Sequence, residues 1–171
     1  MQVLTSMRTP PLCTRRAFVR RGAVLLAASA VLATGAAFAE PSEDASEFDL
    51  GAYKGKVVYL DFWASWCGPC AQSFPYMEEL KQSYGKQGLE IIAVNVDHSR
   101  ERADAFLNKM QSDLHVIYDP KGRLANRFKV KDMPTSMLID RGGAVRYVHQ
   151  GFFPEKTSLY DEHISELLHA N

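Results

Sequence analysis

Cysteine is scarce in this sequence, which has three among 171 residues: Cys13, Cys67 and Cys70. A disulfide between Cys67 and Cys70 would close a very short loop and remove little entropy from the unfolded chain, so it would add little stability. A second Cys-x-x-Cys pair is absent, and structural zinc sites usually need four nitrogen or sulfur ligands. The pair is therefore expected to serve chemistry at its sulfur atoms, not to hold the fold or a zinc ion.

Acidic residues are missing from the first 39 positions, which contain five arginines. Four of these arginines lie between positions 15 and 21, an apolar run of small residues follows, and Ala37-Phe38-Ala39 fits a small-x-small cleavage site. Residues 1–39 are therefore predicted to be a signal peptide that includes Cys13. Residues 14–20 are similar to a twin-arginine export signal, and an ordinary secretory signal is the alternative. The apolar run is short for a membrane span, so an uncleaved N-terminal anchor is the less favoured interpretation.

The net charge of zero hides an uneven distribution. Residues 40–171 carry 15 basic and 20 acidic residues, a net charge of −5. A domain of this charge is not expected to bind nucleic acid or an anionic membrane surface. Residues 40–47 are acidic and contain Pro and Ser, as expected of a mobile leader. Residues 48–171 are long enough for one globular domain.

The stretch from Val57 to Cys70 reads as a strand, a tight turn and the start of a helix. Its first part is short, rich in Val and aromatic residues and without helical periodicity, which predicts a strand buried on both faces. A helix N-terminus stabilises negative charge, so the pKa of a thiol at Cys67 should fall and more of it should be ionised. Pro75 lies inside the predicted helix and should kink it. The apolar face of that helix consists of Phe74, Met77, Leu80 and Tyr84.

The rest of the domain alternates predicted strands and helices. The order β-α-β-α-β-α-β-β-α predicts an α/β sandwich with parallel crossovers followed by an antiparallel hairpin. The further strands are expected at residues 90–96, 114–118, 135–140 and 144–150, and the further helices begin at Ser99, near Leu124 and at Pro154. In the closing helix we expect Leu159, Ile164, Leu167 and Leu168 to face the core and His163 and His169 to face solvent. Phe152 and Phe153 are expected to pack against this helix, the alternative being an exposed docking patch.

Trp66-Cys67-Gly68-Pro69-Cys70, placed after an Asp-Phe-Trp strand end, is similar to the motif of the thioredoxin superfamily. Residues 74–77 (Phe-Pro-Tyr-Met) and 92–97 (Ile-Ala-Val-Asn-Val-Asp) resemble its exported TlpA/ResA branch, whose members are thiol–disulfide oxidoreductases outside the cytoplasm. The resemblance covers about residues 48–168. It implies a thioredoxin-like three-layer sandwich: a central mixed sheet with helices on both faces and an extra βα insertion around residues 99–128.

The resemblance also implies roles for individual residues. Cys67, at the exposed start of the helix, would attack a partner's disulfide, and Cys70, one turn deeper, would resolve the mixed disulfide. Asp61 would be a buried acid that exchanges a proton with Cys70, the alternative being a strand-end carboxylate bonded to backbone. The ResA-like pattern usually has a glutamate three residues after the second cysteine, where this chain has Ser73, so proton transfer should rest on Asp61. The residues expected to fix the turn or meet the partner are Trp66, Gly68, Pro69, Met133 and Pro134, with Pro134 in cis.

The expected function is disulfide exchange with exported client proteins in the periplasm, and the reductive direction is favoured. Clients of the apocytochrome c or copper-site assembly type and a membrane-linked thiol donor are implied by the resemblance, with no cofactor and no bound metal. The mature domain is expected to be a monomer. A copper metallochaperone is one alternative, although Met77 and Met110 fit helical core positions. A thiol peroxidase is another, although the Pro-x-x-x-Thr-x-x-Cys motif is missing. The five histidines, at positions 98, 115, 149, 163 and 169, show no ligand spacing.

Overall fold

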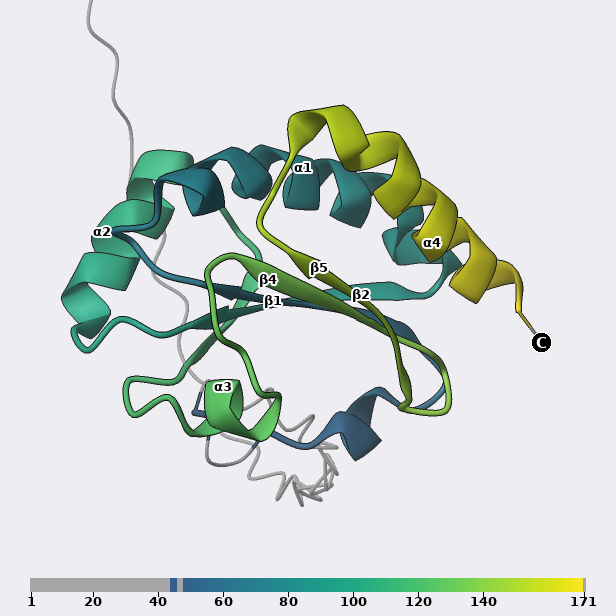
Figure 1. Ribbon diagram of the computed structural model, residues 1–171, viewed down its shortest axis with the longest axis horizontal. Coiled ribbons are helices and arrows are strands. Elements are labelled where there is room, and N and C mark those ends of the chain that lie inside the picture. The colour runs from purple at the N-terminus through teal and green to yellow at the C-terminus, as the bar shows by residue number, and fades with distance from the viewer. Residues whose placement is uncertain (1–43, 46–47, 171) are drawn as a thin grey trace, which may run out of the picture. The chain divides into compact units, whose positions relative to one another are not determined.

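A computed structural model describes residues 44–45 and 48–170 of the chain (Figure 1). The predicted signal peptide, its twin-arginine motif and Cys13 lie outside these residues. Within the described ranges, no helix is long and apolar enough to cross a membrane. In chain order the elements are η1 (Leu50–Tyr53), β1 (Val57–Trp63), α1 (Gly68–Tyr84), η2 (Gly85–Gln87), β2 (Leu89–Asn95), α2 (Arg100–Met110), β3 (His115–Tyr118), α3 (Arg123–Arg127), β4 (Thr135–Ile139), β5 (Val145–Gln150), η3 (Pro154–Lys156) and α4 (Thr157–His169).

The strands form one mixed sheet in the order β3-β2-β1-β4-β5. β1, β2 and β3 run parallel, and β4 is antiparallel to both β1 and β5. Trp63 pairs with Asn95, Asn95 pairs with Tyr118, and Phe62 pairs with Thr135. The first three strands therefore end, and β4 begins, at the same end of the sheet. We call it the cysteine end, because β1 leads from it directly to Cys67.

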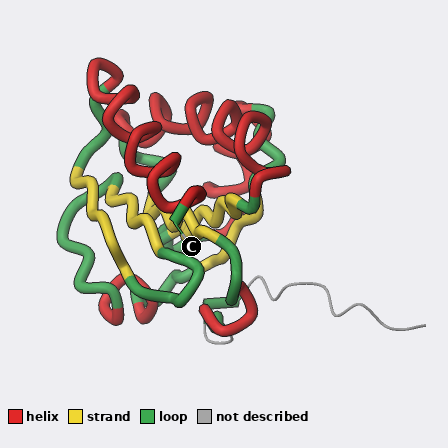
Figure 2. Tube along the Cα trace, turned by 90° about the vertical axis from the view of Figure 1, so that its right-hand side faces the viewer, coloured by secondary structure: helices red, strands yellow, loops and turns green. Residues whose placement is uncertain are grey.

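Helices cover both faces of the sheet and make three layers (Figures 1 and 2). α1, α2 and α4 lie on one face, and η1 and α3 lie on the other. Each face has its own cluster of buried apolar side chains. β1 lies between the two clusters with all seven residues buried, which explains why its sequence lacks an alternation of apolar and polar residues. The predicted order of elements is confirmed, and α1 continues through Pro75 as one helix.

Part of the acidic leader pairs with the sheet. Asp44 forms a parallel β-bridge with Tyr118, and the backbone N of Ala45 donates to the Tyr118 carbonyl oxygen at 3.2 Å. The edge strand β3 offers unpaired backbone groups to which a passing segment can bond. Residues 44 and 45 therefore lie beside β3, and the mobility expected of residues 40–47 stays a prediction.

Two apolar side chains near the C-terminus are more exposed than expected. Leu159 is 44% exposed and Phe153 is 42% exposed, while Phe152 is buried. Successive helical residues are rotated by about 100°, so Leu159 lies to one side of the stripe that meets the core. The buried stripe of α4 consists of Tyr160, Ile164, Leu167 and Leu168.

His163 is half-buried, which corrects the expectation that it faces solvent. Its ring stacks on Tyr147 with centroids 3.8 Å apart, and its Nδ1 lies 3.0 Å from His149 Nε2. Tyr147 and His149 are two residues apart on β5 and therefore point to the same face of the sheet, toward α4. The ring contacts thus join α4 to β5.

Candidate active site

Cys67 and Cys70 form a disulfide at the first turn of α1. Cys67 is the N-cap residue, and its Sγ accepts a hydrogen bond from the Cys70 backbone N at 3.2 Å. The sulfur thus takes the place of the oxygen in an ordinary serine or aspartate cap. Pro69 fits the first turn because its missing N–H would have no helical partner there. The positive end of the helix dipole therefore lies at the Cys67 sulfur, where it would stabilise a thiolate after reduction.

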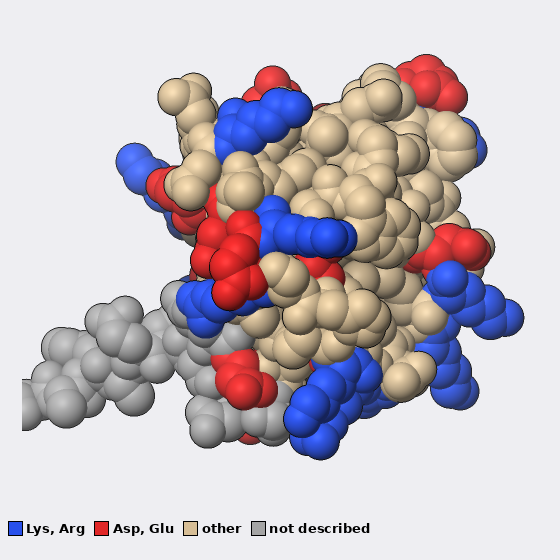
Figure 3. Space-filling view, turned by 90° about the vertical axis from the view of Figure 1, so that its left-hand side faces the viewer, with Lys and Arg blue, Asp and Glu red and all other residues tan. Residues whose placement is uncertain are grey.

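The sulfur atoms are less open than the sequence suggested. Cys67 keeps 6% of its surface and Cys70 none, whereas Trp66 is 68% exposed. Gly68 and Pro69 are exposed as well. Figure 3 looks onto this end of the domain, where uncharged side chains form a continuous area bordered by charged ones. A partner molecule that approaches Cys67 would therefore meet the exposed residues on either side of it, Trp66 and Gly68-Pro69.

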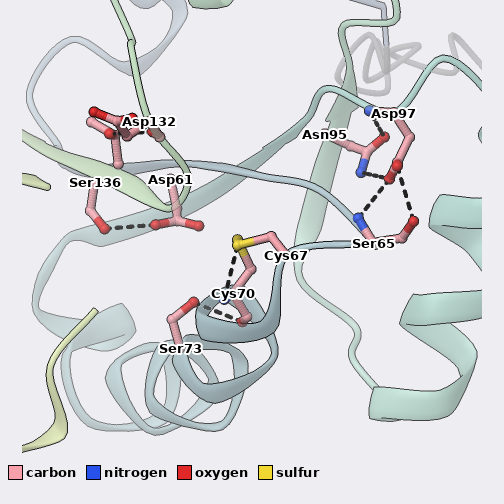
Figure 4. The surroundings of a disulfide bond; sticks show 10 residues. Asp61, Ser65, Cys67, Cys70, Ser73, Asn95, Asp97, Asp132 and Ser136 are labelled. Carbon is pink, nitrogen blue, oxygen red and sulfur yellow. Dashed lines mark hydrogen bonds between the residues drawn. A yellow bond between two sulfur atoms is a disulfide. The ribbon is translucent and has the colours of Figure 1, made fainter. Parts of the chain in front are cut away.

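Asp61 is a fully buried carboxyl group on β1. Its Oδ1 accepts a hydrogen bond from Ser136 Oγ at 2.6 Å, and its Oδ2 has no partner among the described residues. Figure 4 shows the carboxyl group directed toward the disulfide. Burial raises the pKa of Asp61 to about 7, while the hydrogen bond from Ser136 acts in the opposite direction. The group is therefore poised to gain or lose a proton near neutral pH.

Ser136 and Tyr59 are site residues that the sequence did not single out. Tyr59 donates its hydroxyl hydrogen to Ser136 Oγ at 3.0 Å, and Ser136 in turn donates to Asp61. Asp61 pairs with Ser136 across β1 and β4, and Tyr59 lies two residues before Asp61 on the same face. The sequence did show a serine, Ser136, within the otherwise apolar strand β4. That this serine contacts Asp61 follows only from the register between β4 and β1. The two hydroxyl groups hold one oxygen of Asp61 and leave the other directed at the sulfur atoms.

The peptide bond between Met133 and Pro134 is cis, as the resemblance implied. The Pro134 carbonyl oxygen accepts a hydrogen bond from the Gly151 backbone N at 2.8 Å, which ties this loop to the segment after β5. Met133 is half-buried and packs against the apolar cluster that contains both cysteines. The fold therefore brings Met133 and Pro134 to the cysteine end, and their part in binding a client stays a prediction.

A second buried carboxyl group, Asp97, lies on the other side of the cysteines (Figure 4). It accepts hydrogen bonds from the backbone N and the Oγ of Ser65, at 2.8 and 3.0 Å. It also accepts one from Asn95 Nδ2 at 2.8 Å. Because Ser65 is two residues before Cys67, these bonds fix the turn that leads from β1 into the helix.

Ser73 occupies the position at which the ResA-like pattern usually has a glutamate. It is buried, and its Oγ donates to the Cys70 carbonyl oxygen at 3.0 Å. This position therefore holds a hydroxyl group already engaged by the helix backbone, and it offers no acid to the cysteines. Asp61 is the carboxyl group that Figure 4 shows directed at them.

The methionines of the copper alternative lie in the core. Met77 is buried, and Met110 packs against the same apolar cluster. In the part of the chain that the structure describes, no group of three or more His, Cys, Asp or Glu residues is arranged to hold a metal ion. Core packing accounts for both methionines.

A model of the Redoxin family matches residues 28–164. The chain belongs to the Redoxin family. Two relatives, both named thiol-disulfide oxidoreductase ResA, come from Geobacillus kaustophilus and Geobacillus thermodenitrificans, and they are 38% and 36% identical to this chain over 105 and 124 residues. The first match spans 61% of this chain and 60% of that relative's own length, and the second spans 72% and 71%. The resemblance to ResA-like Redoxin proteins is thus confirmed.

Solved structures agree on the fold. A candidate thiol:disulfide interchange protein DsbE from Chlorobium tepidum has 44% sequence identity and a TM-score of 0.68, over 70% of this chain and 84% of that one. The pneumococcal exposed lipoprotein thioredoxin Etrx1 from Streptococcus pneumoniae has 32% identity and a TM-score of 0.57, over 70% of this chain and 91% of that one. The thioredoxin-like sandwich predicted from the sequence is therefore confirmed.

Proposed function

We propose that this Redoxin-family chain is a thiol–disulfide oxidoreductase that exchanges disulfides with client proteins through Cys67 and Cys70. The observation that carries the proposal is the place of the disulfide, at the capped start of α1 with the buried carboxyl group of Asp61 directed at it. The names of its ResA relatives and of its DsbE-like neighbour support the same activity. The two sulfur atoms themselves store the electron pair, so the exchange needs no further cofactor.

In the reductive direction, the Cys67 thiolate attacks the client disulfide, forms a mixed disulfide and releases the first client thiolate. The Cys70 thiol then gives its proton to the unpartnered oxygen of Asp61. The Cys70 thiolate attacks the Cys67 sulfur, which closes the internal disulfide and releases the second client thiolate. Two electrons pass from protein to client, and an external dithiol must reduce the Cys67–Cys70 disulfide before the next cycle.

The client would lie over the uncharged area beside the cysteines. Trp66 and Pro69 are exposed there, and the backbone of Met133 can pair with an extended client segment as an added strand does. Pro134 keeps that loop tied to Gly151, and Gly68 keeps side-chain bulk away from the sulfur. These contacts would position a client sulfur for attack by Cys67.

We place this activity outside the cytoplasm and favour the reductive direction. The predicted signal peptide supports export to the periplasm, and similarity to an exposed lipoprotein thioredoxin fits that location. Cys-Gly-Pro-Cys is the thioredoxin sequence, and thioredoxin lies at the reducing end of the range of such proteins. A membrane-linked thiol donor would supply the electrons, and the family resemblance implies apocytochrome c or a copper-site assembly protein as client.

The first test is the reduction of insulin by the purified protein with dithiothreitol as electron donor. Cys67→Ser should abolish turnover, because the remaining Cys70 is fully buried. Retained activity would remove Cys67 from the role of nucleophile.

A second test uses Cys70→Ser, which should stop the reaction at the mixed disulfide. Expressed in cells, this variant should accumulate covalent adducts with clients that dissociate on addition of a reductant. Mass spectrometry of the adducts would identify the clients, and a complete lack of adducts would count against resolution by Cys70.

A further inference from the structure

A run of positive charge leads through α3 to the cis-proline loop. Residues 121–131 include no Asp or Glu. We call residues 121–131 the basic segment. Its exposed basic side chains are Lys121, Arg123, Arg127, Lys129 and Lys131.

The basic segment borders the site already described. It begins just after β3 ends and stops just before β4 begins, and both of these points lie at the cysteine end of the sheet. Lys131 is two residues before Met133, so their Cα atoms are at most about 7.6 Å apart. Figure 3 shows Lys and Arg side chains below the uncharged area on this end of the domain. A client segment lying over that area would therefore end close to these charges.

The rest of the domain has the opposite charge. Outside the basic segment, residues 40–171 contain 10 basic and 20 acidic residues, a net charge of −10. Helix α2, which also begins at the cysteine end, mixes the two signs, and its Arg100 lies 3.8 Å from Asp104. The basic segment is thus a local positive region on a negative domain.

Lys129 adopts a conformation that favours glycine. Its φ is 57°, in the left-handed region. The backbone N of Lys129 donates to the Asn126 oxygen at 3.0 Å, and that of Val130 donates to the Ala125 oxygen at 2.9 Å, which is the bonding of a helix end that commonly carries glycine. A lysine here costs stability relative to glycine. The local fold therefore does not account for the charged residue.

We propose that the basic segment recognises acidic residues that flank the reactive cysteine of a client protein. The inference rests on the proposed exchange at Cys67 and adds the class of client. The occupant is an extended protein segment with Asp or Glu a few residues from its cysteine. Opposite charges raise the rate of association at low ionic strength. A membrane or a nucleic acid would extend past the basic segment and meet the acidic remainder of the domain, which makes a short acidic segment the better fit.

The test compares three disulfide-bonded peptides that differ only in their flanks, which carry Glu, Gln or Lys. The reduced protein is mixed with each peptide, and the second-order rate constant is measured at about 20 mM and about 200 mM salt. We expect the Glu peptide to react about tenfold faster than the Gln peptide at low salt, with most of the advantage lost at high salt. Equal rates for all three peptides would overturn the inference.

A matched pair of variants separates the basic segment from net charge. Lys121→Gln/Lys129→Gln/Lys131→Gln should bring the Glu-to-Gln rate ratio close to one. The control Lys54→Gln/Lys86→Gln/Lys109→Gln removes as many exposed lysines outside the basic segment and should keep the ratio. An equal loss in the control would overturn the inference, because net charge would then explain the preference.

Lys129→Gly provides a readout that a purely structural lysine would not give. This variant should raise the melting temperature, because glycine adopts positive φ without strain, and should also lower the preference for the Glu peptide. A higher melting temperature with an unchanged preference would remove Lys129 from the proposed surface.

Two further measurements distinguish a failure of this inference from a failure of the proposed function. The neutral reagent bis(2-hydroxyethyl) disulfide reports exchange alone: if the protein reduces it but shows no peptide preference, the inference falls and the proposed function stands. If the protein does not reduce it, both fall. Binding to vesicles of anionic phospholipid that needs Lys121, Lys129 and Lys131, without any peptide preference, would overturn the inference in favour of a membrane surface.

Discussion

Two buried carboxyl groups flank the disulfide, and they differ in how their oxygen atoms are satisfied. Asp97 accepts three hydrogen bonds, two from Ser65 and one from Asn95. Asp61 accepts one, from Ser136, and its second oxygen has no partner in the described part of the chain. The first arrangement holds a turn in place, and the second leaves an oxygen free to take a proton.

The position of each residue in the sheet explains the difference. Asp97 follows the end of β2, where the turn after β1 presents a backbone N–H that no strand uses. Asp61 lies within β1, where the neighbouring backbone groups already bond to β2 and β4. A carboxyl group inside a central strand can therefore be satisfied only by side chains. Burial raises the pKa of Asp61 to about 7, and the single hydrogen bond from Ser136 offsets only part of this rise.

The largest expected effect concerns stability as a function of pH. Because burial raises the pKa of Asp61 from 3.8 to about 7, the folded protein binds more protons than the unfolded chain between these values. Its free energy of unfolding therefore falls as pH rises through that window. Asp61→Asn removes the effect, so relative to the wild type the variant should gain up to roughly 4 kcal/mol between about pH 4 and pH 7.

Urea unfolding of the disulfide form at several pH values measures this difference. Burial lowers the pKa of His149 to about 4, which gives a slope of opposite sign, with stability rising from about pH 4 to 6.5. That slope is present in both proteins and cancels in the difference. A difference that does not change with pH would show that Asp61 does not titrate in this window.

The next effect is on the rate of exchange. At pH 7, Asp61→Asn should slow the reduction of a model disulfide about 100-fold, because the proton of Cys70 loses its acceptor. The inflection of the pH–rate profile near the pKa of Asp61 should vanish as well. Asp97→Asn is the matched control and should keep the inflection. An Asp61→Asn profile identical to that of the wild type would reject Asp61 as the proton carrier.

A smaller effect, on stability, is expected when Asp97, the carboxyl group that accepts three hydrogen bonds, is removed. Asp97→Ala leaves the Ser65 backbone N and Asn95 Nδ2 without their acceptor, and such loss of buried hydrogen bonds should cost about 2 kcal/mol of unfolding free energy. Urea unfolding at neutral pH would measure it. If Asp97→Ala proved as stable as the wild type, the hydrogen bonds of Asp97 would not be what holds the turn before Cys67.

The same contrast shows what could be predicted from the sequence. The strand β1 and the cysteine pair are local signals, so an apolar run and the Cys-Gly-Pro-Cys motif were enough to identify them. Asp61 and the cis Pro134 came from the family resemblance. The hydrogen bonds of both carboxyl groups were missed, because Ser136 lies 75 residues from Asp61 and Ser65 lies 32 residues from Asp97. Contacts of this kind depend on strand register and loop packing, which no local pattern encodes.

The burial of individual side chains was also poorly predicted from the sequence. Cys67 was expected at an exposed helix start and is nearly covered, and His163 was expected in solvent and stacks on Tyr147. Both outcomes depend on which neighbours the fold supplies. Helical periodicity identified which side of α4 faces the core, but not how wide the buried stripe is. Leu159, which lies beside that stripe, was therefore expected in the core and is exposed. The chemistry of the site was thus more predictable than its accessibility.

The smallest expected effect tests whether Ser136 sets the proton affinity of Asp61. Ser136→Ala removes the hydrogen bond that favours the ionised carboxylate, so the pKa of Asp61 should rise and the midpoint of the pH–rate profile should move up by about half a unit. Tyr59→Phe removes a bond one step further away and should move the midpoint less, while Ser136→Thr keeps a hydroxyl group and should restore it. If Ser136→Ala lowered stability and left the midpoint in place, the serine would only fill space between β1 and β4. The single hydrogen bond that distinguishes Asp61 from a wholly unsatisfied acid would then have no part in the chemistry.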